Sequence, residues 1–335
     1  MEILFENNKI YEPTCMAIGV FDGVHLGHRF LLEMMQKSAF ASGLKSFVVT
    51  FKNHPQNFFY PQNNFKLLTT ETEKVDLVSE INPDFILLLD FDKRISAMKA
   101  ADFLLFLKKN YSLKKLIIGY NHSFGADKIK DFEQYKKIGE SLDIEVEQCP
   151  PLPHCHCDID PESVKKAEII EKAISGHTSA LPSSQAHNEN VSSSNIRNLL
   201  LNGDIEKANA MLGTKYFLNG TVQHGEKIGR TIGFPTANLE ISTQKLIPKD
   251  GVYSVEVSFK NFFFNGMLCI GNRPTVSGKN QSVEVNIFDF NEDIYNQKIK
   301  IFFNHFIREN RKFDNLQQLK NQIEKDKEDT IMKKH

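Results

Sequence analysis

The apolar positions of this chain follow a different period in each half. In the first third, short apolar runs typical of buried strands alternate with stretches whose apolar residues recur at helical spacing. The predicted strands are Met16–Val20, Ser46–Phe51, Phe85–Leu89 and Leu116–Ile118, and the predicted helices are Arg29–Ser42 and Ala100–Lys109. Strands that alternate with helices indicate a mostly parallel sheet covered by helices.

From Phe217 onward the apolar residues recur with a period of two. The strand candidates, joined by Gly, Pro and Asn turns, are Thr221–Val222, Gly251–Phe259, Phe262–Ile270, Ser282–Phe288 and Lys298–Phe303. This pattern predicts an antiparallel barrel, in which we expect the Phe residues of 259–264 to form core. A helix is predicted over Asn195–Met211 between the halves, and Leu316–Glu328 predicts a closing helix with a solvated, charged face.

The chain therefore divides into an α/β Rossmann-like domain, a linking helix and an antiparallel β-barrel with a C-terminal helix. The predicted ranges are 1–190, 191–213 and 214–330, with a flexible insert at about 150–190. Within the insert, Asp160 and Pro161 begin a helical pattern and 177–190 reads as a polar loop. The run from His154 to Cys157 alternates His and Cys, which places the two His on one face of an extended segment and the two Cys on the other. Four ligands then cannot converge without a bend, which disfavours a metal site.

Composition narrows the class of protein. The chain has 335 residues, 41% of them hydrophobic, and 41 Lys plus Arg balance 42 Asp plus Glu, which gives none of the basic excess of a nucleic-acid binder. Five cysteines do not suggest a disulfide framework. The longest purely apolar run, Phe85–Leu89, is too short to cross a bilayer. We expect a cytoplasmic protein with no nucleic-acid or membrane partner.

A candidate phosphate site follows the first predicted strand. The segment Gly19–His28 contains His25-Leu26-Gly27-His28 and opens directly into a helix. A glycine-bearing turn at a helix N-terminus offers free backbone N–H groups and the positive end of the helix dipole. Two histidines there can stabilise the charge that builds up when the α-phosphorus of a triphosphate is attacked.

A second candidate site lies in the predicted barrel at Gly225–Asn238. Its glycines and cationic residues make a loop that can wrap phosphates with backbone donors. Thr236 and Asn238 follow, and their side-chain oxygens suit Mg²⁺.

Both motifs resemble those of known enzyme families. The N-terminal half resembles H-x-G-H nucleotidyltransferases and in particular bacterial FMN adenylyltransferases (FAD synthetases), also through Phe51–Pro55, Gly119–Gly125 and Val191–Arg197. The C-terminal half resembles riboflavin kinase, also through Gly271–Thr275, Glu284–Phe290 and Arg308–Phe313. The sequence departs from the usual family residues at Asn53 (Pro), Ser194 (Thr) and Asn286 (His).

This resemblance implies a bifunctional flavin enzyme. It would phosphorylate riboflavin to FMN with ATP in the barrel, and adenylylate FMN to FAD with release of pyrophosphate in the α/β domain. The implied catalytic residues are His25, His28, Arg197 and Glu284, the last as base for the ribityl 5′-hydroxyl. The implied nucleotide- and flavin-binding residues are Gly19, Phe21, Asp22, Gly23, Gly27, Asn121, Ser193, Ser194, Gly225, Lys227, Gly229, Arg230, Gly233, Thr236, Asn238 and Arg308, with Thr236 and Asn238 also holding Mg²⁺.

Other interpretations stay open at this point. One is a kinase whose N-terminal module has become structural, against which the presence of His25, His28 and Arg197 argues. Others are a flavin-sensing regulatory protein, which would not need Glu284, and a redox flavoprotein. We expect riboflavin, FMN and ATP as small-molecule substrates, and a monomer or weak homo-oligomer.

Overall fold

The computed structural model describes residues 1–120, 123–151, 191–225, 229, 233–275 and 278–332. Several predicted features lie outside these residues: the helix beginning at Asp160, the loop at 177–190, the His154–Cys157 run, and the site residues Asn121, Lys227 and Arg230. Within the described residues, no helix has the length and apolar character needed to span a membrane.

The N-terminal domain is built on a six-stranded parallel sheet with the strand order β1-β4-β3-β2-β5-β6. Its strands are β1 (Glu2–Phe5), β2 (Thr14–Ile18), β3 (Lys45–Phe51), β4 (Phe85–Leu89), β5 (Leu113–Ile118) and β6 (Glu145–Gln148). The helical segments are α1 (Leu26–Ala41), α2 (Pro55–Phe59), η1 (Pro61–Asn63), α3 (Glu71–Ser79), α4 (Lys93–Ala97), α5 (Ala100–Tyr111) and α6 (Phe132–Ser141). One face of the sheet packs on α5 through Phe103 and Leu107, and the other on α1 through Leu32 and Met35.

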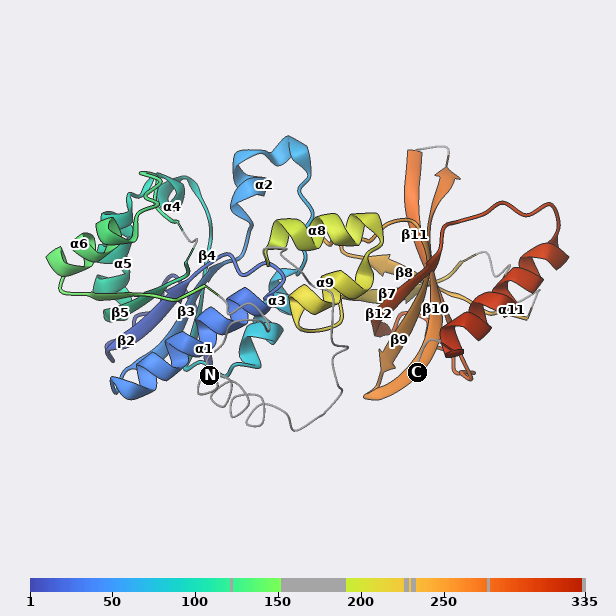
Figure 1. The fold of residues 1–335 in the computed structure, drawn as a ribbon, viewed down its shortest axis with the longest axis horizontal. Helices are drawn as coiled ribbons and strands as arrows, with labels where there is room; N and C mark the ends of the chain where they lie inside the picture. Colours follow the sequence, from blue (N-terminus) through green and yellow to red (C-terminus); the bar gives the residue numbers. More distant parts are fainter. Residues whose placement is uncertain (121–122, 152–190, 226–228, 230–232, 276–277, 333–335) are drawn as a thin grey trace, which may run out of the picture.

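The C-terminal domain is a closed antiparallel barrel with the strand order β10-β11-β8-β7-β12-β9 (Figure 1). Its strands are β7 (Phe217–Gln223), β8 (Ala237–Ile241), β9 (Gly251–Phe259), β10 (Phe262–Thr275), β11 (Gly278–Ile287) and β12 (Lys298–Arg308). The closing helix α11 (Leu316–Met332) packs on β10 and β12. The predicted order of a parallel α/β domain, an antiparallel barrel and a C-terminal helix is confirmed.

The segment between the domains differs from the single predicted helix. It forms two helices, α8 (Ser193–Asn202) and α9 (Ile205–Leu212), which lie between the sheet and the barrel (Figure 1). Gly203 ends α8 in the left-handed region at φ 88°, and its N–H bonds back to Leu200. Glycine adopts this conformation without the cost that a side chain would bring. The helical spacing continues across Gly203, so the pattern alone does not reveal the break.

The barrel edge also corrects one expectation. Phe259 is buried in the core as expected, whereas Phe262 and Phe263 are exposed, so the core interpretation of this phenylalanine run is wrong for these two. Lys260 and Asn261, both at positive φ, form the turn between β9 and β10.

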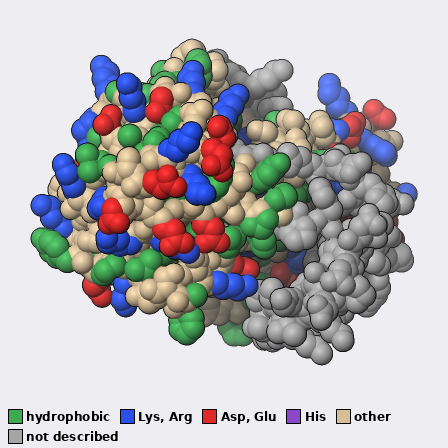
Figure 2. Space-filling model, turned by 60° about the vertical axis from the view of Figure 1, so that its left-hand side comes forward, with side chains coloured by type: hydrophobic (Ala, Val, Ile, Leu, Met, Phe, Trp, Pro, Cys, Tyr) green, Lys and Arg blue, Asp and Glu red, His purple; other side chains and the backbone are tan. Residues whose placement is uncertain are grey.

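On the face shown in Figure 2, positive and negative side chains are interspersed, so the charges that matter for a phosphate ligand are those at the individual sites.

Candidate active sites

The turn between β2 and α1 is tightly folded. Phe21 and Val24 are non-glycine residues in the left-handed region, at φ 51° and 41°, and Gly23 lies between them at φ 88°. Phe21 folds back over Gly19, where an added Cβ would come within 2.8 Å of the phenyl ring. A chain held in this way stores strain, which is typical of functional turns.

The two histidines of the turn stack on each other. Their ring centroids are 3.7 Å apart with an interplanar angle of 15°. His25 is the N-cap of α1 and accepts the His28 backbone N–H at Nδ1, 3.3 Å away. Because Nδ1 accepts, the ring proton of the neutral imidazole sits on Nε2. Burial lowers the pKa of His25 to about 4, so it acts as a neutral hydrogen-bonding group near pH 7.

Helix α8 brings the second part of the predicted adenylylation motif to this turn. Ser193 donates its hydroxyl to the Asp22 carbonyl at 2.8 Å, across 171 positions of sequence. Arg197 forms a buried ion pair with the Asp22 carboxylate, and its Nε donates to the Lys66 carbonyl at 3.2 Å. Ser192 is the N-cap of α8, whereas Ser194 is exposed. Ser192 therefore caps α8, whereas its neighbour Ser193 binds the β2–α1 turn.

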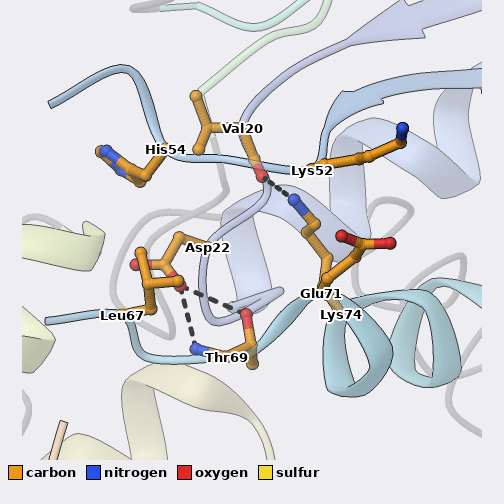
Figure 3. A pocket seen from close by; sticks show the side chains of 8 residues that line it. All are labelled: Val20, Asp22, Lys52, His54, Leu67, Thr69, Glu71 and Lys74. Atoms are coloured by element: carbon orange, nitrogen blue, oxygen red, sulfur yellow. Dashed lines mark hydrogen bonds between the residues drawn. The ribbon is translucent and has the colours of Figure 1, made fainter. Parts of the chain in front are cut away.

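A pocket opens beside Asp22, and Figure 3 shows the side chains around it. It is lined by Val20, Asp22, Lys52, His54, Leu67, Thr69, Glu71 and Lys74. Lys74 reaches in from α3 and donates to the carbonyls of Val20 and Phe51, at the ends of β2 and β3. Burial lowers the pKa of Lys74 to about 8. The pocket thus places the Lys74 ammonium beside the ends of β2 and β3. The segments that follow these two strands contain His25 and His54, respectively.

Asn53 stands where the resembling family usually has proline, and its contacts give a physical reason for that departure. Its side chain donates to the Phe91 carbonyl at 2.9 Å and accepts the Phe91 N–H at 2.8 Å. This reciprocal pair fixes the segment after β3, from which His54 caps α2. The side-chain amide replaces the rigidity that a proline ring would give.

The barrel gathers the predicted kinase residues at the start of β8. Glu284 on β11 pairs in register with Asn238, and it accepts the Thr236 hydroxyl at 3.2 Å. Gly225 and Gly229 lie so close to Asn238 and Phe234 that a Cβ at either position would clash. Gly225 and Gly229 therefore lie directly against Asn238 and Thr236, respectively. Gly233 lies at φ 85° in the same segment.

Asn286, which departs from the usual family residue, and the predicted site residue Arg308 both make contacts that support the barrel. Asn286 donates to the Pro235 carbonyl at 2.7 Å, which holds the Pro235–Thr236 link in place. Arg308 forms a bidentate ion pair with Asp326 of α11, with its Nη2 2.7 Å from Oδ2. In this structure Arg308 fastens the closing helix to β12.

The sequence pattern did not point to Lys74 or Thr69, which line the pocket, and it included His54 only as part of the Phe51–Pro55 motif. Thr69 donates to Asp22 from both its N–H and its hydroxyl and receives the Gly23 N–H. A signal for Lys74 was present, because Thr70 and Glu73 form a capping box that marks the start of α3. Because α3 and the β2–α1 turn are far apart in the sequence, their proximity in the structure could not be predicted.

Comparison with known proteins gives two family matches that divide the chain in the same way. The family described as FAD synthetase matches residues 7–160, and the family described as riboflavin kinase matches residues 212–333. The chain thus combines two transferase modules, one built on the parallel sheet and one on the barrel.

Relatives that match nearly the whole chain are named for both activities. The bifunctional riboflavin kinase/FMN adenylyltransferase of Bacillus subtilis (strain 168) is 32% identical over 322 residues, which cover 95% of this chain and 92% of that protein. The protein of the same name from Buchnera aphidicola is 33% identical over 332 residues, with coverages of 98% and 95%. A crystal structure described as a macrolide-efflux protein from Streptococcus pneumoniae superposes with a TM-score of 0.80 and 28% identity, covering 98% of this chain and 99% of that one. The chain belongs to the bifunctional riboflavin kinase/FMN adenylyltransferase family.

Proposed function

We propose that this chain carries out its two flavin reactions at two separate sites, one in each domain. Family membership assigns it to flavin cofactor biosynthesis: riboflavin plus ATP gives FMN plus ADP, and FMN plus ATP gives FAD plus pyrophosphate. The observation that carries the proposal is that the two predicted residue sets gather at two separate places in the structure. His25, His28, Ser193 and Arg197 meet at the β2–α1 turn, whereas Thr236, Asn238 and Glu284 meet in the barrel.

In the adenylylation site, an FMN phosphate oxygen attacks the α-phosphorus of ATP and the bond to pyrophosphate breaks. His25 and His28 supply hydrogen-bond donors to the phosphate oxygens at the N-terminus of α1. Ser193, Ser194 and Arg197 bind the departing phosphates from the start of α8, and Lys74 adds positive charge at the pocket wall. Because His25 is neutral near pH 7, it contributes a directed Nε2–H donor and not a full charge.

In the kinase site, the ribityl 5′-hydroxyl of riboflavin attacks the γ-phosphorus of ATP. Glu284 accepts the hydroxyl proton as the new O–P bond forms and ADP leaves. Phosphoryl transfer has a loose transition state, so positioning by the glycine-rich segment contributes more than the base. Lys227 and Arg230, which lie outside the described residues, belong to that proposed phosphate-binding loop.

Mg²⁺ fits the kinase site by the chemistry of the groups present. The hydroxyl of Thr236, the side-chain amide of Asn238 and the carboxylate of Glu284 form a local set of oxygen ligands. Thr236 and Asn238 would hold the ion, which when bound neutralises phosphate charge. A cytoplasmic location and a monomer or weak homo-oligomer stay predictions.

The test is a product analysis of two single variants. Glu284→Gln keeps the shape of the side chain but removes the proton acceptor, so FMN formation should fall by roughly 10²- to 10⁴-fold. Conversion of supplied FMN to FAD should continue in the same variant. His28→Ala removes a donor at the adenylylation site, so FAD formation should fall by roughly 10²- to 10³-fold while FMN accumulates.

A matched control for the barrel is Glu240→Gln. Glu240 lies on β8, is exposed, and accepts a hydrogen bond from the Gln223 side chain at 2.9 Å, so the same chemical change should leave both reactions within about two-fold of the parent. Products from riboflavin, ATP and Mg²⁺ are separated by chromatography, and FMN is supplied in a parallel assay. Loss of FAD formation from supplied FMN in a folded Glu284→Gln protein would contradict the two-site proposal.

A further inference from the structure

Besides the Asp22–Arg197 pair, a buried ion pair joins the α/β domain to the barrel domain. Lys245, which precedes β9 in the barrel domain, lies 2.6 Å from Glu73 of α3, and their side chains are only 1% and 4% exposed. Asn219 of β7 donates to the other Glu73 oxygen at 2.8 Å. Two oppositely charged groups from different domains are thus fixed in one geometry with little access to water.

The Lys245 ammonium also holds the backbone of the segment that binds the Asp22 carboxylate. Its Nζ donates to the Leu68 carbonyl at 2.7 Å. The Leu68 N–H in turn donates to the Asp22 carboxylate at 3.2 Å. Leu67 is bonded on both sides to the barrel segment, to the Gln244 carbonyl and the Leu246 N–H, each at 2.8 Å. One short loop of the α/β domain is therefore held by the barrel while it holds the carboxylate that pairs with Arg197.

The chemistry of Lys245 favours positioning over simple docking. A buried ion pair gains little net stability, because the desolvation of both charges offsets their attraction. An apolar pair would join two domains equally well. What the ammonium adds is direction: it binds a carboxylate and one particular carbonyl at once. Burial itself lowers the pKa of Lys245, and Glu73 opposes that effect.

We propose that Lys245, contributed by the kinase domain, is a positioning residue for FAD synthesis. Through the Leu68 peptide it fixes Asp22, and through Asp22 it fixes the Arg197 guanidinium. The inference rests on the proposed role of Arg197 in adenylylation. The proposal predicts that a substitution of Lys245 in the barrel domain slows FAD synthesis and leaves FMN formation in the barrel unchanged.

The experiment separates positioning from stability by removing the pair in two ways. Lys245→Met alone leaves Glu73 buried without its partner and is expected to destabilise the protein. Glu73→Gln combined with Lys245→Met removes both charges and keeps the fold, but it still deprives the Leu68 carbonyl of its donor. The matched control is Lys215→Met, which removes a barrel-domain ammonium that lies 3.7 Å from Glu256 and is 45% exposed.

We expect the paired variant to unfold within a few degrees of the parent and to form FMN from riboflavin within about two-fold. Its kcat for converting FMN to FAD should fall on the order of 10- to 100-fold, since small misplacement of a positioning group has effects of this size. The KM for FMN should change less than kcat. Lys215→Met should leave both reactions unchanged. In an Arg197→Gln background, the pair substitution should cause no further loss, because both act on one interaction.

Three results would overturn the proposal: full FAD synthesis by the paired variant, an equal fall of both reactions, or a further independent loss in the Arg197→Gln background. Failure of the site assignment itself has a different signature. An Arg197→Gln enzyme with full FAD synthesis refutes the role of Arg197 and the route through it. An impaired Arg197→Gln enzyme alongside a fully active paired variant refutes only the role of Lys245.

Discussion

Acidification should weaken the α/β domain through two histidines that cap helices. His25 caps α1 and His54 caps α2, and each accepts a backbone N–H at Nδ1. Burial is the main cause that lowers the pKa of both imidazoles to about 4. In the unfolded chain they titrate near 6.5. Between these values the unfolded state binds more protons, so the stability present above about pH 6.5 is lost as the pH falls toward 4.

The pKa of His25 sets the size of this effect. A fall from 6.5 to about 4 corresponds to at most about 3 kcal/mol, of which about 2 kcal/mol is lost by pH 5. Its charged neighbours act in opposite directions, since Asp22 favours the imidazolium and Arg197 opposes it. The ion pair between these two neighbours keeps their combined effect smaller than that of burial.

The variant that isolates this contribution is His25→Asn. Its Oδ1 can accept the same backbone N–H as Nδ1, but it does not titrate. The chain has no tryptophan, so urea unfolding is followed by far-UV circular dichroism at about pH 7.5, 6 and 5. Between the first and last condition, the variant should lose about 2 kcal/mol less of its free energy of unfolding than the parent.

A direct measurement accompanies the unfolding experiment. NMR titration of ¹³C-labelled histidine, with the His25 signal assigned by the variant, should give a midpoint far below that of an exposed imidazole. Equal loss of stability in parent and variant, or a His25 midpoint near 6.5, would refute the reasoning that burial keeps this histidine neutral. An activity that rises as His25 protonates would refute its role as a neutral donor.

Two further substitutions test packing beside the sites. Gly213→Ala places a Cβ against Leu26 at φ 72°, whereas Gly43→Ala adds one in open space at φ 63°; thermal unfolding should show about 1 kcal/mol of loss for Gly43→Ala and clearly more for Gly213→Ala. Asp326→Leu leaves the Arg308 guanidinium without its bidentate partner, and the free energy of unfolding should fall by about 3–5 kcal/mol in a denaturant titration. Equal losses for the glycines, or an unchanged midpoint for Asp326→Leu, would contradict these assignments.

The sequence predicts the two architectures well because each is encoded locally. Phe85–Leu89 is a pure apolar run, and the structure makes it the fully buried strand β4, between β1 and β3, with the same limits. The edge strands β1 and β6 were missed, because their exposed positions break the apolar pattern: both Glu2 and Glu145 lie on the surface. A strand at the edge of a sheet needs only one covered side, so its sequence carries a weaker signal.

Contacts between distant segments account for what the sequence could not predict. The Ser193–Asp22 bond joins residues 171 positions apart, and the Lys245–Glu73 bond joins residues 172 positions apart. Neither depends on a local period. The resemblance to known families placed Ser193 and Asp22 in one site, but it gave no reason to connect Lys245 with either.

Two residues outside the motifs, Leu68 and Thr69, bind the carboxylate of the Asp22–Arg197 pair. A free guanidinium would attract phosphate more strongly, yet it would also be mobile. Asp22 holds Arg197 in a single place, and the carboxylate is itself held by the N–H groups of Leu68 and Thr69. The ion pair weakens the attraction of the guanidinium for phosphate in the substrate-free state, but it fixes the position of the guanidinium before the phosphates bind. Groups whose positions are fixed in advance stabilise a transition state more effectively. The Leu67–Thr69 loop that binds Asp22 is also bonded to the barrel domain, so on our proposal the geometry of the adenylylation site depends on how the two domains are docked.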